Sequence, residues 1–257
     1  MAIRIRNLSF ALATLFFFQL PSRGQEEETP LREFDFYVAS SSRIRNVRFG
    51  VFDETGALTG SSPTGFKTSG RSLSYTYKGP DPIVFFEEEA APTAADPNAV
   101  RQTPVGKSML PPDVGEVLFF FIPNPDYPDS GLKYNVTGID IRQEIVPAGH
   151  VTLFNTIPIT FRGVVGESKN RENGTAFNIT QGINPPIDIQ PQAKVLLALE
   201  SESEGFLRVY ENTIYCDENE RILLVLSPPR IRGSRNVSGK QISLPIRAEK
   251  RKETSGP

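Results

Sequence analysis

The stretch Val117-Leu118-Phe119-Phe120-Phe121-Ile122-Pro123 and the later stretch Ile222-Leu223-Leu224-Val225-Leu226-Ser227-Pro228 decide the fold. Each is an apolar run that ends at a proline. Runs this short, bounded by turn residues, are typical of strands that are buried on both faces. Both stretches therefore predict fully buried strands.

Other stretches support an all-β fold. Alternation of apolar and polar residues, or a short apolar run, predicts strands at 34–38, 47–51, 72–77, 83–86, 195–199, 206–210 and 241–246. No convincing amphipathic helix is present, because Pro92 and Pro97 interrupt the longest helix-permissive stretch, 87–100. We expect 87–112 to form a long surface loop.

Three ordered matches indicate an internal repeat. Residues 75–83 align with 178–187, 117–123 with 222–228, and 131–136 with 239–242, at offsets from 103 to 108. Units of about 100 residues with six or seven short strands have the size of immunoglobulin-like sandwiches. The sequence thus predicts two tandem immunoglobulin-like β-sandwich domains, 31–147 and 148–247. One large sandwich with a coincidental repeat is the alternative.

The first 24 residues have the features of a secretory signal peptide. Arg4 and Arg6 precede an apolar run at 10–20, and Ser22-Arg23-Gly24 supplies small residues at a cleavage site. A membrane anchor is the alternative, but a bilayer needs about 20 apolar residues. We expect 1–24 to be removed, and the protein to be exported to the periplasm, cell surface or extracellular space.

The composition limits the classes of partner and the cellular origin that we expect. Removing three arginines with the leader changes the charge to 28 − 3 − 30 = −5, which argues against nucleic-acid binding. Cys216 is the only cysteine, so no intramolecular disulfide can form, which favours a bacterial origin. Cys216 can be buried and inert or can pair between chains. Residues 248–257 form a basic end that we expect to be disordered.

Catalytic motifs are scarce. His150 is the only histidine, and no G-x-S-x-G sequence is present. Ser130 and Lys133 match S-x-x-K, but in a turn rather than at a helix start. One His and one Cys, 66 positions apart, do not build a zinc site. We predict no enzyme activity, no cofactor and no metal.

Acidic residues leave two alternatives open. Glu87-Glu88-Glu89 and the set Glu200, Glu202 and Glu204 can supply the paired carboxylates of a carbohydrate-active enzyme or its accessory domain. Calcium binding at Asp126 with Asp129, or at 217–220, also remains open, although neither has EF-hand spacing.

The leading hypothesis is an exported, non-catalytic binding or structural module of the cell envelope or extracellular space. Candidate ligand contacts are Tyr127, Asp126 and Asp129, and the loops 87–112 and 166–176. An envelope protein or a polysaccharide is the expected partner, and a basic segment after Pro229 can contact anionic surfaces. An assembly accessory that pairs through open sheet edges is a further alternative.

A resemblance supports the fold and the compartment. The leader, together with "YKGPDPIVFF" at 77–86, "GEVLFFFIPNP" at 115–125 and "ERILLVLSPP" at 220–229, resembles exported bacterial proteins with tandem immunoglobulin-like repeats. The resemblance covers most of the mature chain and implies a tandem sandwich. Its motifs are structural, so it implies no catalytic or binding residue.

Overall fold

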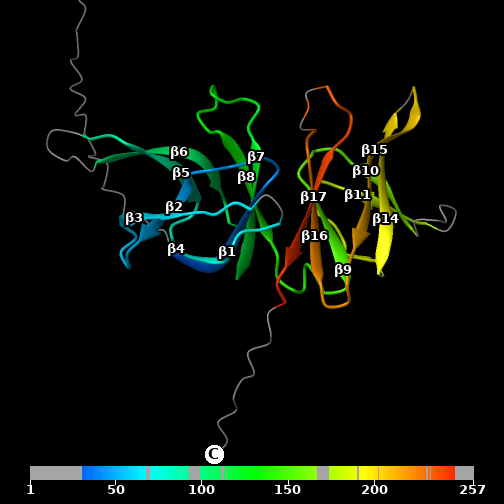
Figure 1. Ribbon diagram of the computed structural model, residues 1–257, viewed down its shortest axis with the longest axis horizontal. Coiled ribbons are helices and arrows are strands. Elements are labelled where there is room, and N and C mark those ends of the chain that lie inside the picture. The colour runs from blue at the N-terminus through cyan, green and yellow to red at the C-terminus, as the bar shows by residue number, and fades with distance from the viewer. Residues whose placement is uncertain are drawn as a thin grey trace, which may run out of the picture. The chain divides into compact units, whose positions relative to one another are not determined.

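The structure is a computed structural model that describes residues 31–246, apart from 68–69, 93–98, 111–112, 114, 167–173, 190, 202, 230 and 232. Every regular element in these residues is a β-strand (Figure 1), which confirms the predicted all-β class. The expected signal peptide, 1–24, and the expected basic tail, 248–257, lie outside the described residues.

The described strands form four sheets. In chain order they are β1 (Arg32–Ser40), β2 (Val47–Phe52), β3 (Leu58–Pro63), β4 (Tyr75–Gly79), β5 (Ile83–Ala90), β6 (Val100–Ser108), β7 (Glu116–Pro123), β8 (Tyr134–Asp140), β9 (His150–Asn155), β10 (Phe161–Gly166), β11 (Thr175–Ile179), β12 (Gly182–Ile183), β13 (Ile187–Asp188), β14 (Gln192–Ser201), β15 (Gly205–Tyr215), β16 (Arg221–Ser227) and β17 (Ser238–Leu244).

The sheet order of the first half of the described chain, 32–140, recurs in the second half, 150–244. Sheets β4-β1-β7-β8 and β3-β2-β5-β6 correspond to β12-β9-β16-β17, with β13 also on β9, and to β11-β10-β14-β15. In each half the first strand pairs in parallel with the penultimate one, β1 with β7 and β9 with β16. Bulges fall at Phe85/Phe86 and at Leu197/Ala198, the same place in both halves. The two halves therefore share one connectivity.

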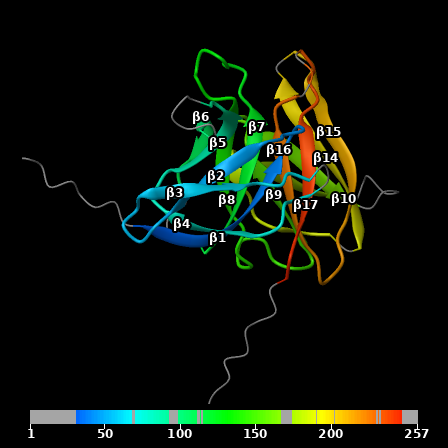
Figure 2. The same cartoon turned by 60° about the vertical axis from the view of Figure 1, so that its left-hand side comes forward.

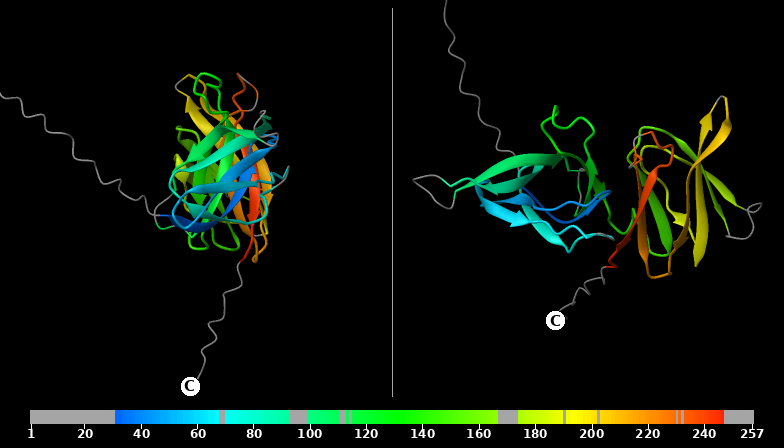
Figure 3. Two further views of the ribbon diagram at one scale, coloured as in Figure 1. Left: turned by 90° about the vertical axis from the view of Figure 1, so that its left-hand side faces the viewer. Right: turned by 45° about the horizontal axis from the view of Figure 1, so that its top comes forward.

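In each half two sheets face each other (right-hand view of Figure 3), and their buried side chains form an apolar core between them. The first core is aromatic: the rings of Phe36, Phe85, Phe119 and Phe121 meet edge to face with centroids 4.9–6.4 Å apart. Such ring pairs add about 0.5–1.5 kcal/mol each beyond burial. The second core is mostly aliphatic.

A third core joins the inner sheets, β4-β1-β7-β8 and β12-β9-β16-β17. Side chains alternate along β7, so Val117, Phe119 and Phe121 enter the first core while Leu118 and Phe120 enter the third. Likewise, β16 sends Ile222, Leu224 and Leu226 to the second core and Leu223 and Val225 to the third. This packing explains why both stretches are apolar without interruption.

Two of the three aligned segment pairs occupy equivalent strands. Residues 117–123 and 222–228 fall in β7 and β16, and 131–136 and 239–242 lead into or lie in β8 and β17. The remaining pair is shifted by a strand. Asn178 and Ile179 belong to β11, which takes the place of β3, whereas β12 and β13 take the place of β4 beside the first strand of their half.

The predicted loop 87–112 is wrong. Strand β5 continues to Ala90 and pairs with β6, which runs from Val100 to Ser108. Proline is tolerated in edge strands and beside bulges because no ladder hydrogen bond from its nitrogen is then needed. Pro104 satisfies both conditions, since β6 is the edge of its sheet and Pro104 pairs with Phe86 at the bulge. Glu87, Glu88 and Glu89 are thus strand residues.

Candidate functional site

The crossover from β1 to β2, residues 41–46, carries the candidate site; Figure 2 brings this half of the molecule forward. The Ser41 amide donates to the Phe121 carbonyl at 3.0 Å, which extends the β1–β7 pairing. Ile44 is buried in the first core, so Arg43 and Arg45 on either side of it are exposed. Asn46, with a φ of 59°, turns the chain into β2.

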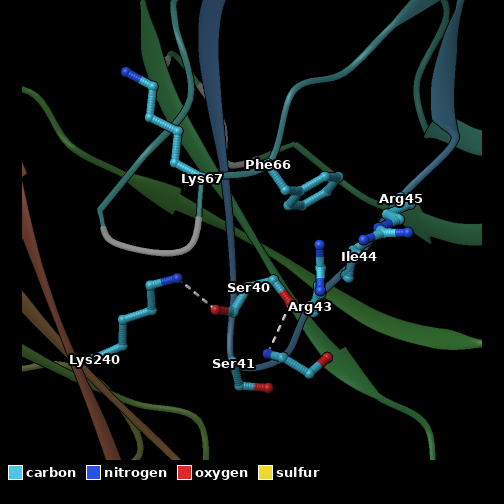
Figure 4. Close-up of a pocket in the computed structure, with 9 residues that line it drawn as sticks. Ser40, Ser41, Arg43, Ile44, Arg45, Phe66, Lys67 and Lys240 are labelled. Atoms are coloured by element: carbon cyan, nitrogen blue, oxygen red, sulfur yellow. Dashed lines mark hydrogen bonds between the residues drawn. The ribbon is translucent and has the colours of Figure 1, made fainter.

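A basic pocket of about 390 Å³ lies against this crossover (Figure 4). Arg43 and Arg45 line it, with the Lys67 side chain at its rim. Lys240 comes from β17 of the second half, and its ammonium donates to the Ser40 carbonyl at 2.7 Å. The remaining lining is Ser40, Ser41, Ser42, Ile44 and Phe66, so no carboxylate is among the lining residues.

The cations of this pocket differ from most others in the described part of the chain. Arg48, Arg101, Arg142, Arg162 and Arg235 each have a guanidinium nitrogen within 3.0 Å of a carboxylate oxygen. No described carboxylate forms an ion pair with Arg43, Arg45 or Lys67. Their charge is therefore available to an external anion, which Arg side chains bind through paired N–H donors.

A second cavity, of about 620 Å³, shares Ser41, Ser42 and Arg43 with the basic pocket. We call it the proline cavity, because Pro123, Pro125, Pro228 and Pro229 line it together with Ile122, Asn135, Thr137 and Thr156. Its lining includes corresponding segments of the two halves, namely the end of β7 and the residues after β16, and the residues after β1 and β9; β8 also contributes. Arg43 thus stands between a basic and an apolar hollow.

The predicted contacts Asp126, Tyr127 and Asp129 lie in the loop between β7 and β8, and all three are exposed. Asn124 holds the loop by donating to Ser130 Oγ at 2.6 Å and to the Leu132 carbonyl at 2.9 Å. None of the three lines the basic pocket or the proline cavity. The structure therefore does not bring them together with Arg43 and Arg45.

The acidic residues considered for glycoside hydrolysis are engaged with cations. Glu88 lies 3.0 Å from Arg48, and Glu200 lies 3.0 Å from Arg162, at the equivalent place in the second half. The Ser61 hydroxyl donates to Glu88 and, with Gln102 and Arg48, lowers the pKa of that carboxyl. A general acid needs a raised pKa instead. Strand β14 ends at Ser201, so Glu204 falls in the turn before β15, and Glu202 is outside the described residues.

The S-x-x-K pair is not assembled as a nucleophile and base. Ser130 Oγ accepts from Asn124 and donates to the Leu132 carbonyl, while the Lys133 ammonium pairs with Glu87. His150 begins β9, and its Nδ1 lies 2.8 Å from the Ala148 carbonyl oxygen.

Cys216 is buried at 2% exposure. Burial raises the pKa of the Cys216 thiol to about 11, and the nearby carboxylates of Glu220, Asp217 and Asp188 add to the shift. The side chain is therefore a thiol at neutral pH, whereas the nucleophilic form is the thiolate.

Two general features concern metals and membranes. Among the described residues, no three His, Cys, Asp or Glu side chains gather as a metal site would require. The described part of the chain also holds no helix that is long and apolar enough to cross a membrane.

Sequence reasoning missed Arg43, Arg45 and Lys67 of the basic pocket and included Lys240 only as part of the basic segment after Pro229. Arg43 and Arg45 fit no motif, and Lys67 and Lys240 lie 22 and 195 positions beyond Arg45. Only the parallel pairing of β1 with β7 and the third core bring these segments together. The alternation of Arg43, Ile44 and Arg45, with one apolar residue between two cations, is the single local signal.

Comparison with known proteins gives no assignment. No protein-family model matches the chain, and no curated protein is detectably similar to it in sequence.

Proposed function

We propose that the protein is an exported, non-catalytic binding module of the cell envelope or extracellular space, which binds an anionic ligand in its basic pocket. The observation that carries this proposal is the gathering of Arg43, Arg45 and Lys240, with Lys67 at the rim, around a hollow lined by no carboxylate. The mature chain is expected to carry a net charge of −5. A local cluster of positive charges can still attract anions, although the protein as a whole is negative.

In this proposal the two halves are tandem immunoglobulin-like units, an architecture that suits a binding role. Each half has two facing sheets, with crossovers from β1 to β2 and from β9 to β10. Sandwiches of this kind bind ligands with the loops at the ends of their strands. The parallel pairing of β1 with β7, and of β9 with β16, sets this architecture apart from fully antiparallel immunoglobulin domains.

A titration with dextran sulfate, using uncharged dextran as the reference, tests the proposal. We expect calorimetric binding of dextran sulfate that weakens as salt is added, because screening shortens the reach of the pocket charges. The double substitution Arg43→Gln and Arg45→Gln should reduce the affinity about tenfold or more, since it removes two charge-assisted donors.

The matched control is Lys78→Gln with Lys107→Gln, which changes the net charge by the same amount on exposed cations in β4 and β6. This control should bind within about twofold of the unmodified protein, because neither lysine lines the pocket. Equal losses in both double variants, or no binding to dextran sulfate at low salt, would refute the proposal.

A further inference from the structure

We infer that the ligand of the basic pocket is an acidic polypeptide segment that also places an aromatic side chain in the neighbouring proline cavity. This inference rests on the proposed anion binding at Arg43 and Arg45 and adds the chemical class of the partner. The juxtaposition that carries it is the shared border of the two hollows at Ser41, Ser42 and Arg43.

The two arginines line one pocket and can meet two carboxylates of one peptide. Ile44 is buried while its neighbours Arg43 and Arg45 are exposed, and both arginines line the basic pocket. In extended backbone, residues i and i+2 lie about 6.6 Å apart. Carboxylates at alternate positions of an extended acidic peptide are about this far apart, so one peptide can present two carboxylates to the pocket that Arg43 and Arg45 line.

The proline cavity fits an apolar ring. Its walls include four proline rings and Ile122, and its polar side chains are four hydroxyl residues and Asn135, apart from Arg43 at the border. Its volume of about 620 Å³ lies within the roughly 300–1,000 Å³ of ligand pockets. An aromatic side chain buried in such a hollow is the usual energetic centre of a protein interface.

The same walls disfavour a glycan. A sugar ring carries hydroxyl groups around its rim, and burying a hydroxyl without a hydrogen bond costs about 1–3 kcal/mol. Hydroxyl and amide side chains of the lining can pair with some of those hydroxyls, but the four proline rings and Ile122 cannot, and no aromatic side chain of this protein lines the cavity. An anionic polysaccharide is thus expected to use the basic pocket alone.

The absence of tryptophan from the sequence provides a direct readout. The probe is a capped peptide, Gly-Trp-Ala-Asp-Ala-Asp-Gly, whose indole is the only tryptophan in the sample. We expect binding with a blue shift of its emission and an affinity about tenfold or more above that of two reference peptides, as an anchored ring gives. In one reference peptide Ala replaces Trp, and in the other Asn replaces both Asp residues.

Two variants separate the hollows. Arg43→Gln with Arg45→Gln should abolish binding of the peptide, and Lys78→Gln with Lys107→Gln should leave it unchanged. Asn135→Phe fills the proline cavity from an exposed position in β8 and should remove the blue shift and the advantage of Trp, while binding of dextran sulfate persists. Circular dichroism verifies that each variant retains its β-sheet spectrum.

The outcomes distinguish this inference from the proposed function. If dextran sulfate binds through Arg43 and Arg45 but Trp confers no advantage and no blue shift, the peptide inference is wrong and anion binding stands. Tighter binding of dextran sulfate than of the peptide would assign the site to a polysaccharide. If neither probe binds, both proposals fail.

Discussion

At the scale of single residues, Arg221 is the most deeply buried charged side chain of the described residues, at 1% exposure. Its Nε donates to the Val146 carbonyl and its Nη1 to the Pro245 carbonyl, both at 2.7 Å, and its Nη2 donates to the Ile141 carbonyl. Glu116 Oε2 lies 4.0 Å from Nη1. Arg221 and Glu116 are the first residues of β16 and β7, which are equivalent strands. The pair therefore links corresponding points of the two halves.

Replacing Arg221 with Met should destabilise the protein by about 3–5 kcal/mol, because it leaves three carbonyls without their donor and removes the positive charge near the buried Glu116 carboxylate. Urea unfolding followed by circular dichroism measures the loss. The control is Arg235→Met: Arg235 is 67% exposed and lies 2.8 Å from Glu204. Loss of that exposed pair should cost less than about 1 kcal/mol.

The double variant Arg221→Met with Glu116→Leu separates the ion pair from packing. A buried pair replaced by apolar side chains of similar volume often costs little, so the double variant should be more stable than Arg221→Met alone. A cost for Arg221→Met no greater than for Arg235→Met would contradict this account, and so would a double variant less stable than the single one.

At the scale of strands, each half is closed along one side by a glycine that faces a larger side chain. In the first half, a Cβ at Gly106 of β6 would lie 2.6 Å from Val136 Cγ2 of β8. In the second half the roles are exchanged, since a Cβ at Gly239 of β17 would overlap the Tyr210 ring of β15. Gly239 and Val136 are equivalent positions, opposite Leu226 and Phe121 respectively. The glycine can thus stand on either strand of the closing pair.

Gly239→Val should therefore destabilise the protein by about 1–3 kcal/mol, because the Tyr210 ring must move out of its place. Tyr210→Ala should make the same Gly239→Val substitution less costly in a double-mutant cycle measured by urea unfolding. Gly60→Val is the control, because a Cβ at Gly60 of β3 meets no atom within 4 Å. Equal effects of Gly60→Val and Gly239→Val would show that β-propensity, not the contact with Tyr210, governs this site.

The sequence predicted strands more reliably than their partners. The unbroken apolar run at 117–121 predicted a strand buried on both faces, and those residues are all buried. Its parallel pairing with β1 joins residues about 80 positions apart, and no local pattern encodes such a contact. Strand β6 was not predicted, because Pro104 indicates a loop when its position at a bulge in an edge strand is not known.

The candidate site was less accessible to sequence reasoning than the strands. Tyr127, Asp126 and Asp129 were selected for being polar or aromatic in a turn, and the structure places them outside both hollows. The basic pocket depends on the contact between Lys240 and Ser40, residues 200 positions apart. Such a site becomes visible only after the inner sheets are packed, because the individual cations have no spacing that distinguishes them.

At the scale of the whole molecule, the third core determines how the protein unfolds. It contains Tyr37, Ala39, Leu118, Phe120, Ile139, Ile141, Val146, Leu223, Val225, Ile242 and Leu244. Tandem domains usually meet through small, polar interfaces and move relative to one another. Here the faces of β7 and β16 outside their own cores are fully buried and apolar, so either half alone would expose Leu118 and Phe120 or Leu223 and Val225 to water.

We therefore expect residues 31–246 to unfold in one cooperative transition. Native-state hydrogen exchange read by mass spectrometry should give β5 and β14, one from each outer sheet, the same opening free energy within about 1 kcal/mol. The double substitution Phe120→Ser with Leu223→Ser should split the single unfolding transition into two, because buried hydroxyls weaken the third core while leaving the other two cores intact. Phe85→Leu, in the first core, should lower the free energy of unfolding without splitting the transition. Two separate opening free energies in the unmodified protein would show that the third core does not couple the halves, and the basic pocket, which needs Lys240 beside Ser40, would then form only part of the time.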